Sequence, residues 1–216
     1  MRPALPSVVG MSTPTLPSTH PVTRDTTALL ARAAAIGLVL GVGDLLLIHL
    51  LPYPLADLAN SSAMWALAAF VLGRVLRTTP ELAAAAGAVL LVVAVESYYL
   101  AAALVDLASL GSLVSATTVA WCVMAVLAGG AFGAAGAWSR DDGAWRSAAA
   151  VALVTSVLLA EAWLRRGLTD TSLLTAAVGL IALVGFSRGP AEAARAGLLV
   201  VPLAALCVGG FAVAGF

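Results

Sequence analysis

The side chains in this sequence that could do chemistry are few, and most of them lie inside long apolar segments. Burying such a group costs free energy unless it is paired or used, so each one marks a candidate site. We predict a ligand-binding site formed by Asp44, Asn60, Trp65, Glu96, Tyr99, Thr118 and Glu161. Carboxylates without a deeply placed Arg or Lys favour a cationic or proton-coupled ligand over an anion.

Glu96 is predicted to be the principal charged anchor of this site. It lies about four helical turns after Pro80 and is therefore deep in its segment. Tyr99 follows three residues later on the same helix face, where it could hydrogen-bond the carboxylate or a ligand. Asp44 is expected to be the second anchor, although it could instead pair with a neighbouring helix.

Two further candidates have a purely structural alternative. Glu161 could pair with Arg165, four residues later on the same helix face. Asn60 could cap the first turn of the helix that follows it. The sequence leaves both interpretations open for these residues.

Common catalytic and metal-binding patterns do not account for the candidate residues. The sequence contains no G-x-S-x-G, no H-E-x-x-H and no phosphate-binding glycine loop before a Lys. Its two cysteines, Cys122 and Cys207, lie inside apolar runs without a Cys/His cluster, so we expect no metal and no cofactor. Asp141 and Asp142 could bind a metal with phosphate, but the flanking arginines favour a solvated turn.

The composition requires a lipid environment for the elements that carry these groups. Hydrophobic residues make up 62% of the chain and charged residues 10%, against about 45–50% and 25% in soluble domains. A soluble fold of this size could not hide so much apolar surface. A net charge of zero gives no basic face for nucleic acid. The expected fold is an all-α, polytopic transmembrane helical bundle.

Seven apolar segments follow a Pro-, Ser- and Thr-rich stretch, residues 1–24, which we predict to be a disordered cytoplasmic tail. A spanning helix needs about 20 apolar residues. The segments are 29–51, 61–76, 80–105, 114–138, 148–164, 172–186 and 196–216. They form one bundle, residues 25–216, of about seven spans. A six-span bundle, with one of the last two segments re-entrant or interfacial, stays open.

The arginines predict the orientation of this bundle. All basic residues are Arg, and four groups of them share one side if the segments alternate in direction: Arg24 with Arg32, Arg74 with Arg77, Arg140 with Arg146, and Arg188 with Arg195. Because cytoplasmic loops are enriched in basic residues, we predict a multi-pass protein of the inner (plasma) membrane with a cytoplasmic N-terminus. Arg165 and Arg166, on the opposite side, are the exception.

With this orientation, the polar candidates all fall in the outer half of the bilayer. They come from the second halves of odd-numbered segments and the first halves of even-numbered ones. Five segments therefore place polar side chains at one depth. This pattern indicates a cavity open to the extracytoplasmic side.

Small residues spaced four apart predict close helix contacts. Such pairs let backbones approach where hydrophobicity cannot drive association. They occur at Gly37 with Gly41, Ala83 with Gly87, and Gly129 with Gly133. These pairs could pack inside the bundle or receive a helix of a partner protein.

Four stretches of the sequence resemble an uncharacterised actinobacterial membrane-protein family, domain of unknown function 6518. The stretches are residues 58–65 with Gly73, residues 96–99, residues 129–136 and residues 159–163. The resemblance implies a shared helical bundle and carries no activity. A weaker analogy, based on length and the polar layer, links the chain to the substrate-binding subunits of energy-coupling-factor transporters.

Three hypotheses about function remain at this point. The first is a protein that binds or transports a small molecule through an outward-facing polar cavity. The second is a structural or interaction subunit of a membrane complex, whose glycine faces meet a partner. The third is an intramembrane enzyme acting on lipid, with Glu96 or Asp44 as general base.

Overall fold

The computed structural model describes residues 22–105 and 109–214, and every regular element in them is helical. The elements in chain order are α1 (Val22–Leu50), α2 (Leu55–Ala59), α3 (Ser62–Val75), α4 (Pro80–Leu104), the 3-10 helix η1 (Leu110–Val114), α5 (Ala116–Trp138), α6 (Ala144–Leu164), α7 (Thr169–Phe186) and α8 (Pro190–Ala214). The prediction of an all-α helical bundle is confirmed.

Six of these helices, α1, α4, α5, α6, α7 and α8, are long and apolar enough to cross a membrane. Each predicted segment corresponds to one helix. The segment that is too short to count as a full span is the second one, α3, whereas both of the last two segments, α7 and α8, are long enough. With 14 residues, α3 is about 21 Å long, against a hydrocarbon core of about 30 Å. The caps explain its length, because α3 starts at the side-chain cap of Ser61 and ends before Thr79 and Pro80.

Several helices begin before the apolar segment that predicted them. The first turns of α1, α7 and α8 contain Asp25, Asp170 and Glu192. Acidic residues suit the positive end of the helix dipole but interrupt the apolar pattern. Of the predicted tail 1–24, residues 1–21 lie outside the described residues, and residues 22–24 belong to α1.

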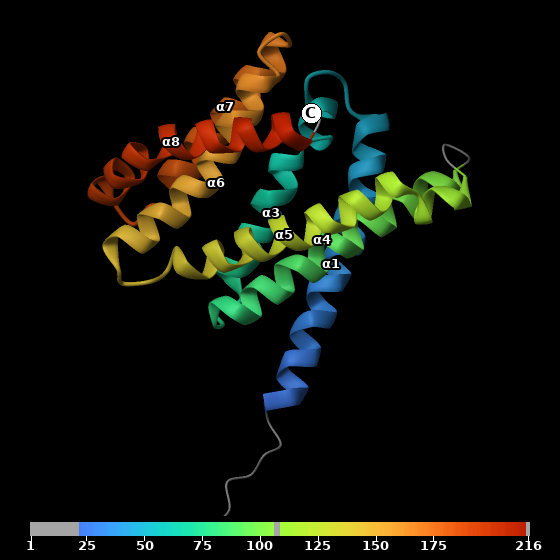
Figure 1. The fold of residues 1–216 in the computed structure, drawn as a ribbon, viewed down its shortest axis with the longest axis horizontal. Helices are drawn as coiled ribbons and strands as arrows, with labels where there is room; N and C mark the ends of the chain where they lie inside the picture. Colours follow the sequence, from blue (N-terminus) through green and yellow to red (C-terminus); the bar gives the residue numbers. More distant parts are fainter. Residues whose placement is uncertain (1–21, 106–108, 215–216) are drawn as a thin grey trace, which may run out of the picture.

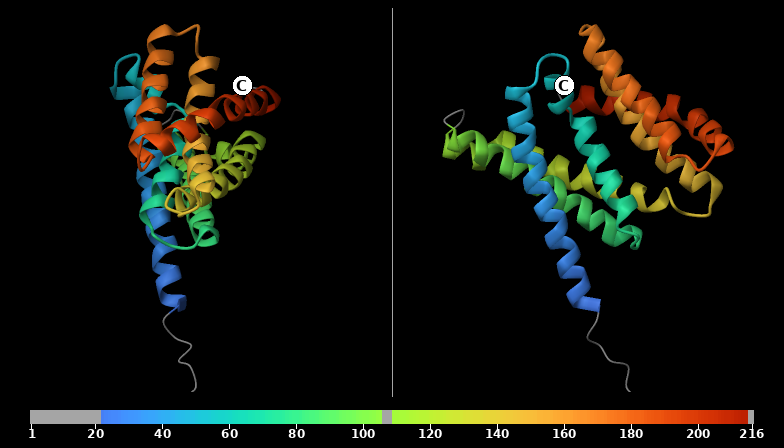
Figure 2. Two further views of the ribbon diagram at one scale, coloured as in Figure 1. Left: turned by 90° about the vertical axis from the view of Figure 1, so that its left-hand side faces the viewer. Right: turned by 180° about the vertical axis from the view of Figure 1, so that it is seen from behind.

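The helices form two packed groups (Figures 1 and 2). In the first group, α4 and α5 lie side by side, while α1 and α3 pack across them. In the second group, α6 packs against both α7 and α8. Most of the apolar stretch of helix α6 is buried inside the protein, and α6 also contacts α3 and α5. It is therefore the helix that joins the two groups.

Glycines set the close contacts of the first group. A Cβ atom on Gly37 or Gly41 would lie 2.3 or 2.1 Å from a carbonyl oxygen of α4. Gly87 and Gly129 face one another across α4 and α5, and each would place a Cβ within 2.3 Å of the other's carbonyl oxygen. The glycine pairs predicted from the sequence thus pack inside the bundle.

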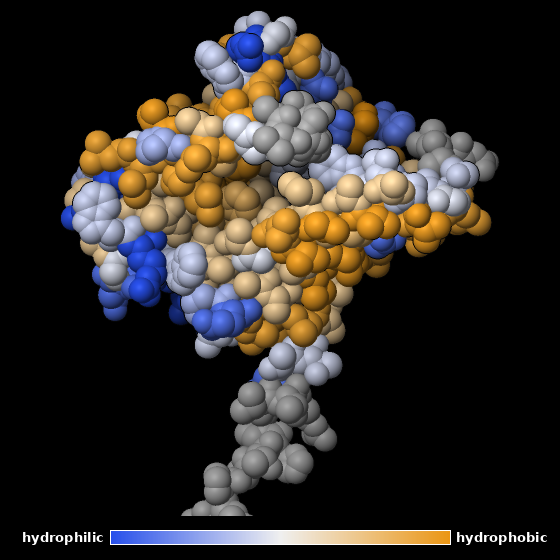
Figure 3. Space-filling model, in the orientation of Figure 1, coloured by the Kyte–Doolittle hydropathy of each residue, from blue (hydrophilic) through white to orange (hydrophobic). Residues whose placement is uncertain are grey.

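The surface shows an apolar belt between two polar ends (Figure 3). Hydrophilic side chains gather where α5 passes into α6 and, at the opposite end, where α6 passes into α7. Between these ends large apolar side chains are exposed, among them Val39, Leu127, Leu198 and Leu206. Such a belt is unfavourable in water and favourable in a bilayer, so these helices form a multi-pass membrane protein.

Candidate functional site

A cavity of about 460 Å³ lies between the two groups of helices. Its walls come from α1, α3, α4, α5, α6 and α8, and this face of the molecule is hollowed between α5 and α8 (Figure 3). The volume is within the usual range of small-molecule sites, about 300–1,000 Å³. Four of the predicted site residues line it: Asp44, Asn60, Trp65 and Tyr99.

The cavity has a polar end built around Asp44. This carboxylate is on α1 and is 6% exposed. Ser61 caps α3 by accepting a hydrogen bond from the Met64 amide at 3.2 Å, and this cap fixes the first turn of α3 beside the cavity. Trp65, one turn further along α3, interacts with the Asp44 carboxylate. The cap of α3 therefore places an indole against the buried charge.

Aromatic side chains line the same cavity. Tyr98 and Tyr99 of α4 line the cavity, and their rings meet edge to face with centroids 5.6 Å apart. Trp121 of α5 lines it as well. Aromatic faces attract cations through their quadrupole. With Trp65, four aromatic residues and one carboxylate line this cavity, a combination that suits an organic cation.

The body of the cavity is apolar. Its lining there includes Leu91, Val95, Phe132, Leu153 and Val157. The wall on the α8 side holds Cys207 and Gly210, and Met124 of α5 is 43% exposed beside the cavity. The cavity is thus amphipathic, with a charged end and an apolar body, and it opens on the face between α5 and α8 (Figure 3).

Glu96, the anchor predicted first, does not line this cavity. It is half-buried, and its Oε1 accepts a hydrogen bond from the Cys122 thiol at 3.1 Å. Cys122 belongs to α5, so the carboxylate lies at the contact between α4 and α5. Tyr99 is three residues away and does face the cavity.

Glu161 and Thr118 are also outside the cavity lining, and both are buried. The Glu161 carboxylate accepts a hydrogen bond from the Ala63 amide at 2.8 Å, in the first turn of α3, and pairs with Arg165 at 2.8 Å. Thr118 donates to the Ser112 carbonyl at 2.6 Å. Both residues stabilise helix ends beside the cavity.

Arg165, one of the two arginines predicted on the side opposite to the other arginine groups, is fixed by an ion pair and by hydrogen bonds to backbone carbonyls. Besides the ion pair with Glu161, it donates hydrogen bonds to the carbonyl oxygens of Asp57 and Asn60 at 2.8 and 2.6 Å. Arg166 stacks over the Trp163 ring and donates to its carbonyl. Arg165 therefore joins α6 to α2 and to the residue that follows it, whereas the contacts of Arg166 stay within its own helix end.

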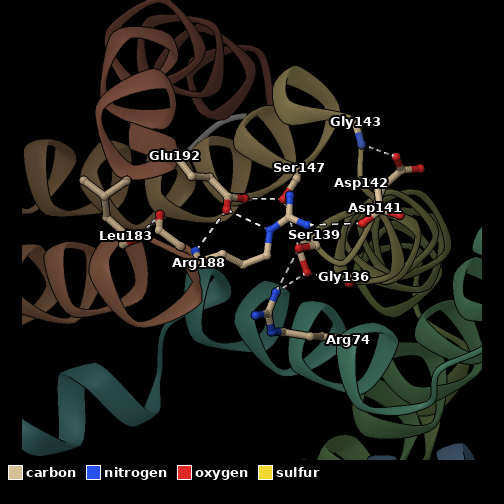
Figure 4. A network of polar contacts seen from close by, with 11 residues as sticks. Arg74, Gly136, Ser139, Asp141, Asp142, Gly143, Ser147, Leu183, Arg188 and Glu192 are labelled. Atoms are coloured by element: carbon tan, nitrogen blue, oxygen red, sulfur yellow. Dashed lines mark hydrogen bonds and ion pairs between the residues drawn. The ribbon is translucent and has the colours of Figure 1, made fainter. Parts of the chain in front are cut away.

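At the other end of α6, arginines from three connections meet in a polar network (Figure 4). Arg74 of α3 donates to the side chain and the carbonyl of Ser139, at the end of α5. Ser147 of α6 donates to the Ser139 carbonyl and to Glu192 of α8. Arg188 pairs with Glu192 at 3.0 Å. Three of the four predicted arginine groups therefore share one end of the molecule.

The exposed edge of this network is the turn between α5 and α6. The Gly143 amide donates to Asp141 at 2.7 Å, and Arg146 pairs with the same carboxylate at 2.8 Å. These two donors hold the pKa of Asp141 below its ordinary value of 3.8. The turn is exposed, as expected for the solvated turn that the flanking arginines favour. The participation of Glu192 and Ser147 in the network was not predicted.

These features define a class, the multi-pass α-helical membrane proteins, with an amphipathic cavity at one end and an arginine network at the other. The chain belongs to a family of unknown function, DUF6518, whose model matches residues 20–215. Neither the curated proteins nor the solved structures contain a match to this chain. The analogy to energy-coupling-factor subunits therefore stays a prediction.

Proposed function

We propose that this protein binds a small amphipathic cation in the cavity, with the cationic group at Asp44 and the apolar part in the body. One observation carries the proposal: a buried carboxylate closes the polar end of a cavity that is otherwise mainly apolar. A buried charge needs a partner of opposite sign. Among the described residues, the lining holds neither Arg nor Lys. A bound cation would supply the missing charge.

The surrounding aromatic residues support a cation of organic type. Trp65, Tyr98, Tyr99 and Trp121 line the same cavity as Asp44. Quaternary and substituted ammonium groups are recognised by such rings because they carry charge over an apolar surface. Asp44 is the single acidic residue among the described lining residues, and the described residues contain no group of three or more His, Cys, Asp and Glu that could hold a metal ion.

The entry route follows from the orientation. The polar end lies at the side opposite to the arginine network, and we propose that this is the extracytoplasmic side. The glycine pairs, on which the interaction-subunit hypothesis rested, are occupied by neighbouring helices of the same chain. Their packing lends no support to a partner helix and leaves the cavity as the stronger feature.

The test uses two probes of nearly equal shape and opposite charge, tetraphenylphosphonium and tetraphenylborate. Binding to the purified full-length protein is followed by the fluorescence of Trp65 and Trp121, which line the cavity. We expect the cation to bind and the borate to bind weakly or not at all. Asp44→Asn should weaken cation binding at least tenfold, because a charged partner contributes about 1.5–3 kcal/mol.

Glu96→Gln is the matched control. It removes a carboxylate of another helix, α4, that does not line the cavity, so cation binding should stay within about twofold. Equal binding of both probes, or equal loss in the two variants, would contradict the proposal. Native mass spectrometry of the same samples then identifies the molecule that the wild type retains.

A further inference from the structure

A second hollow, of about 320 Å³, lies at the other end of the molecule. It is formed where the end of α5 and the beginning of α6 diverge, with Leu203 of α8 closing one side. Its walls are Ala135, Ala149, Ala150 and Leu153. These side chains offer only apolar contacts. We call this hollow the crevice; its apolar lining suits a hydrocarbon chain, and it does not include Asp44.

The open end of this crevice carries an aromatic residue and a cation. Trp138 and Arg146 complete its lining, and both are exposed, Trp138 by 40% and the Arg146 side chain by 62%. Trp145, 59% exposed, is adjacent. Exposed tryptophans next to arginine mark the level of lipid headgroups. The apolar walls therefore lie at acyl-chain depth and Arg146 at phosphate depth.

The charge at this end favours an anion. Six arginines lie in or beside the three connections that meet here, against four acidic residues: Arg74, Arg77, Arg140, Arg146, Arg188 and Arg195, with Glu81, Asp141, Asp142 and Glu192. Arg74 has only the neutral oxygens of Ser139 as hydrogen-bond partners among the described residues. The Nε atom of Arg140 is buried without a hydrogen-bond partner in the described structure.

We propose that this crevice binds an anionic phospholipid, with one acyl chain against the alanines of α5 and α6 and the phosphate at Arg146. Basic pockets between helices on the cytoplasmic side are suited to anionic headgroups. The phosphate would share Arg146 with Asp141, whose pairing at this exposed position is weak. The proposal does not depend on a ligand in the first cavity.

The test measures quenching of Trp138 by brominated lipids. The full-length protein is reconstituted in phosphatidylcholine vesicles that contain brominated phosphatidylglycerol or, in parallel, brominated phosphatidylcholine. The contribution of Trp138 is the difference between each protein and its Trp138→Phe counterpart. We expect the anionic lipid to quench Trp138 at about one fifth of the concentration that the zwitterionic lipid needs, the preference that one arginine at the surface provides.

Two variants separate the parts of the proposed site. Arg146→Gln should reduce the fivefold preference to about one, while Ala149→Leu, which fills the crevice and keeps the arginine, should reduce quenching by both lipids. The control is Arg166→Gln, an exposed arginine that also lies beside a tryptophan, Trp163, but at the opposite end. It should leave the quenching of Trp138 unchanged.

Two results would overturn the proposal. The first is equal quenching by the two lipids in the wild type, and the second is a preference that survives Arg146→Gln.

Discussion

Asp44, Glu96 and Glu161 are the three carboxylates that the sequence predicts at one depth, and their surroundings in the structure differ. Asp44 faces a cavity, Glu96 lies at the contact of two helices, and Glu161 caps a helix. The sequence predicted that each of them lies within an apolar segment, and each does lie in a long apolar helix. Which of them face one another depends on helix rotation and crossing, and one sequence of mostly Ala, Leu and Val carries almost no signal for either.

Glu161 is predicted to contribute to stability. Glu161→Ala removes the acceptor of the Ala63 amide and the partner of Arg165 in buried surroundings. We expect the free energy of unfolding in detergent to fall by about 2–3 kcal/mol, as for the loss of a charged hydrogen bond. Denaturant unfolding monitored by circular dichroism measures this change.

Glu81→Ala is the control for this prediction. Glu81 is an exposed acidic residue in the first turn of α4. Its loss should cost less than about 1 kcal/mol, the usual size of a helix-dipole effect. A Glu161 variant no less stable than the Glu81 variant would show that the cap of α3 does not depend on this carboxylate.

At the scale of elements, glycine spacing predicted more than hydropathy did. The pairs at Gly37 with Gly41 and at Gly87 indicated close approach, and the structure places them against backbone oxygens. The apolar runs indicated where helices exist but not where they begin. Polar first turns such as that of α8 extend beyond the apolar run, and the short length of α3 follows from caps and a proline.

The contact between α4 and α5 predicts a sharp difference between two neighbouring glycines. A Cβ on Gly129 would lie 2.3 Å from the Gly87 carbonyl oxygen, whereas a Cβ on Gly130 meets nothing within 4 Å. Gly129→Ala should therefore cost about 1–3 kcal/mol, because the two helices must separate. The measurement is the free energy of unfolding in the same detergent.

Gly130→Ala serves as the matched control. It should be neutral or slightly stabilising, because alanine favours the helix over glycine by up to about 1 kcal/mol. If both substitutions destabilise equally, α4 and α5 do not approach as closely at Gly129 as the structure describes.

For the whole molecule, the cavity is the space between two groups of helices. One wall comes from α4 and α5, the other from α6 and α8. Polar contacts tie the groups together mainly near the two ends of α6, through Ser147 at one end and through Glu161 and Arg165 at the other. Ser147 and Glu161 are 14 residues apart, about 21 Å along the helix axis. The ends of α6 therefore fix the width of the cavity.

Arg165 is predicted to hold the polar end of the cavity in place. Arg165→Gln removes its charge-assisted hydrogen bonds to the Asp57 and Asn60 carbonyls. We expect backbone amides of residues 56–64 to exchange hydrogen about tenfold faster, because local opening becomes easier by about the strength of one such bond. Hydrogen exchange with mass spectrometry measures the rates.

Arg166→Gln is the comparison for this prediction. The hydrogen bond and the ring contact of Arg166 both lie within its own helix end, at Trp163. Exchange in residues 56–64 should not change in this variant. The same exchange rates in both variants would mean that Arg165 does not join the two groups.

At this scale the sequence predicted the alternation of helices between two ends, and the structure brings three arginine groups together at one of them. The number of complete spans was harder to predict. Hydropathy counts apolar residues, whereas α3 connects both ends with 14 residues by packing against longer neighbours.

Both proposals rest on one arrangement: the Asp44 end of the cavity faces the outside, and the arginine network faces the cytoplasm. The most direct test is cysteine labelling in intact cells, in a background with Cys122→Ala and Cys207→Ala. Asn60→Cys marks the cavity end and Asp142→Cys the arginine end; both positions are exposed. We predict that a membrane-impermeant maleimide labels the cysteine at position 60 from outside and the one at position 142 only after permeabilisation. The reverse pattern would contradict the account.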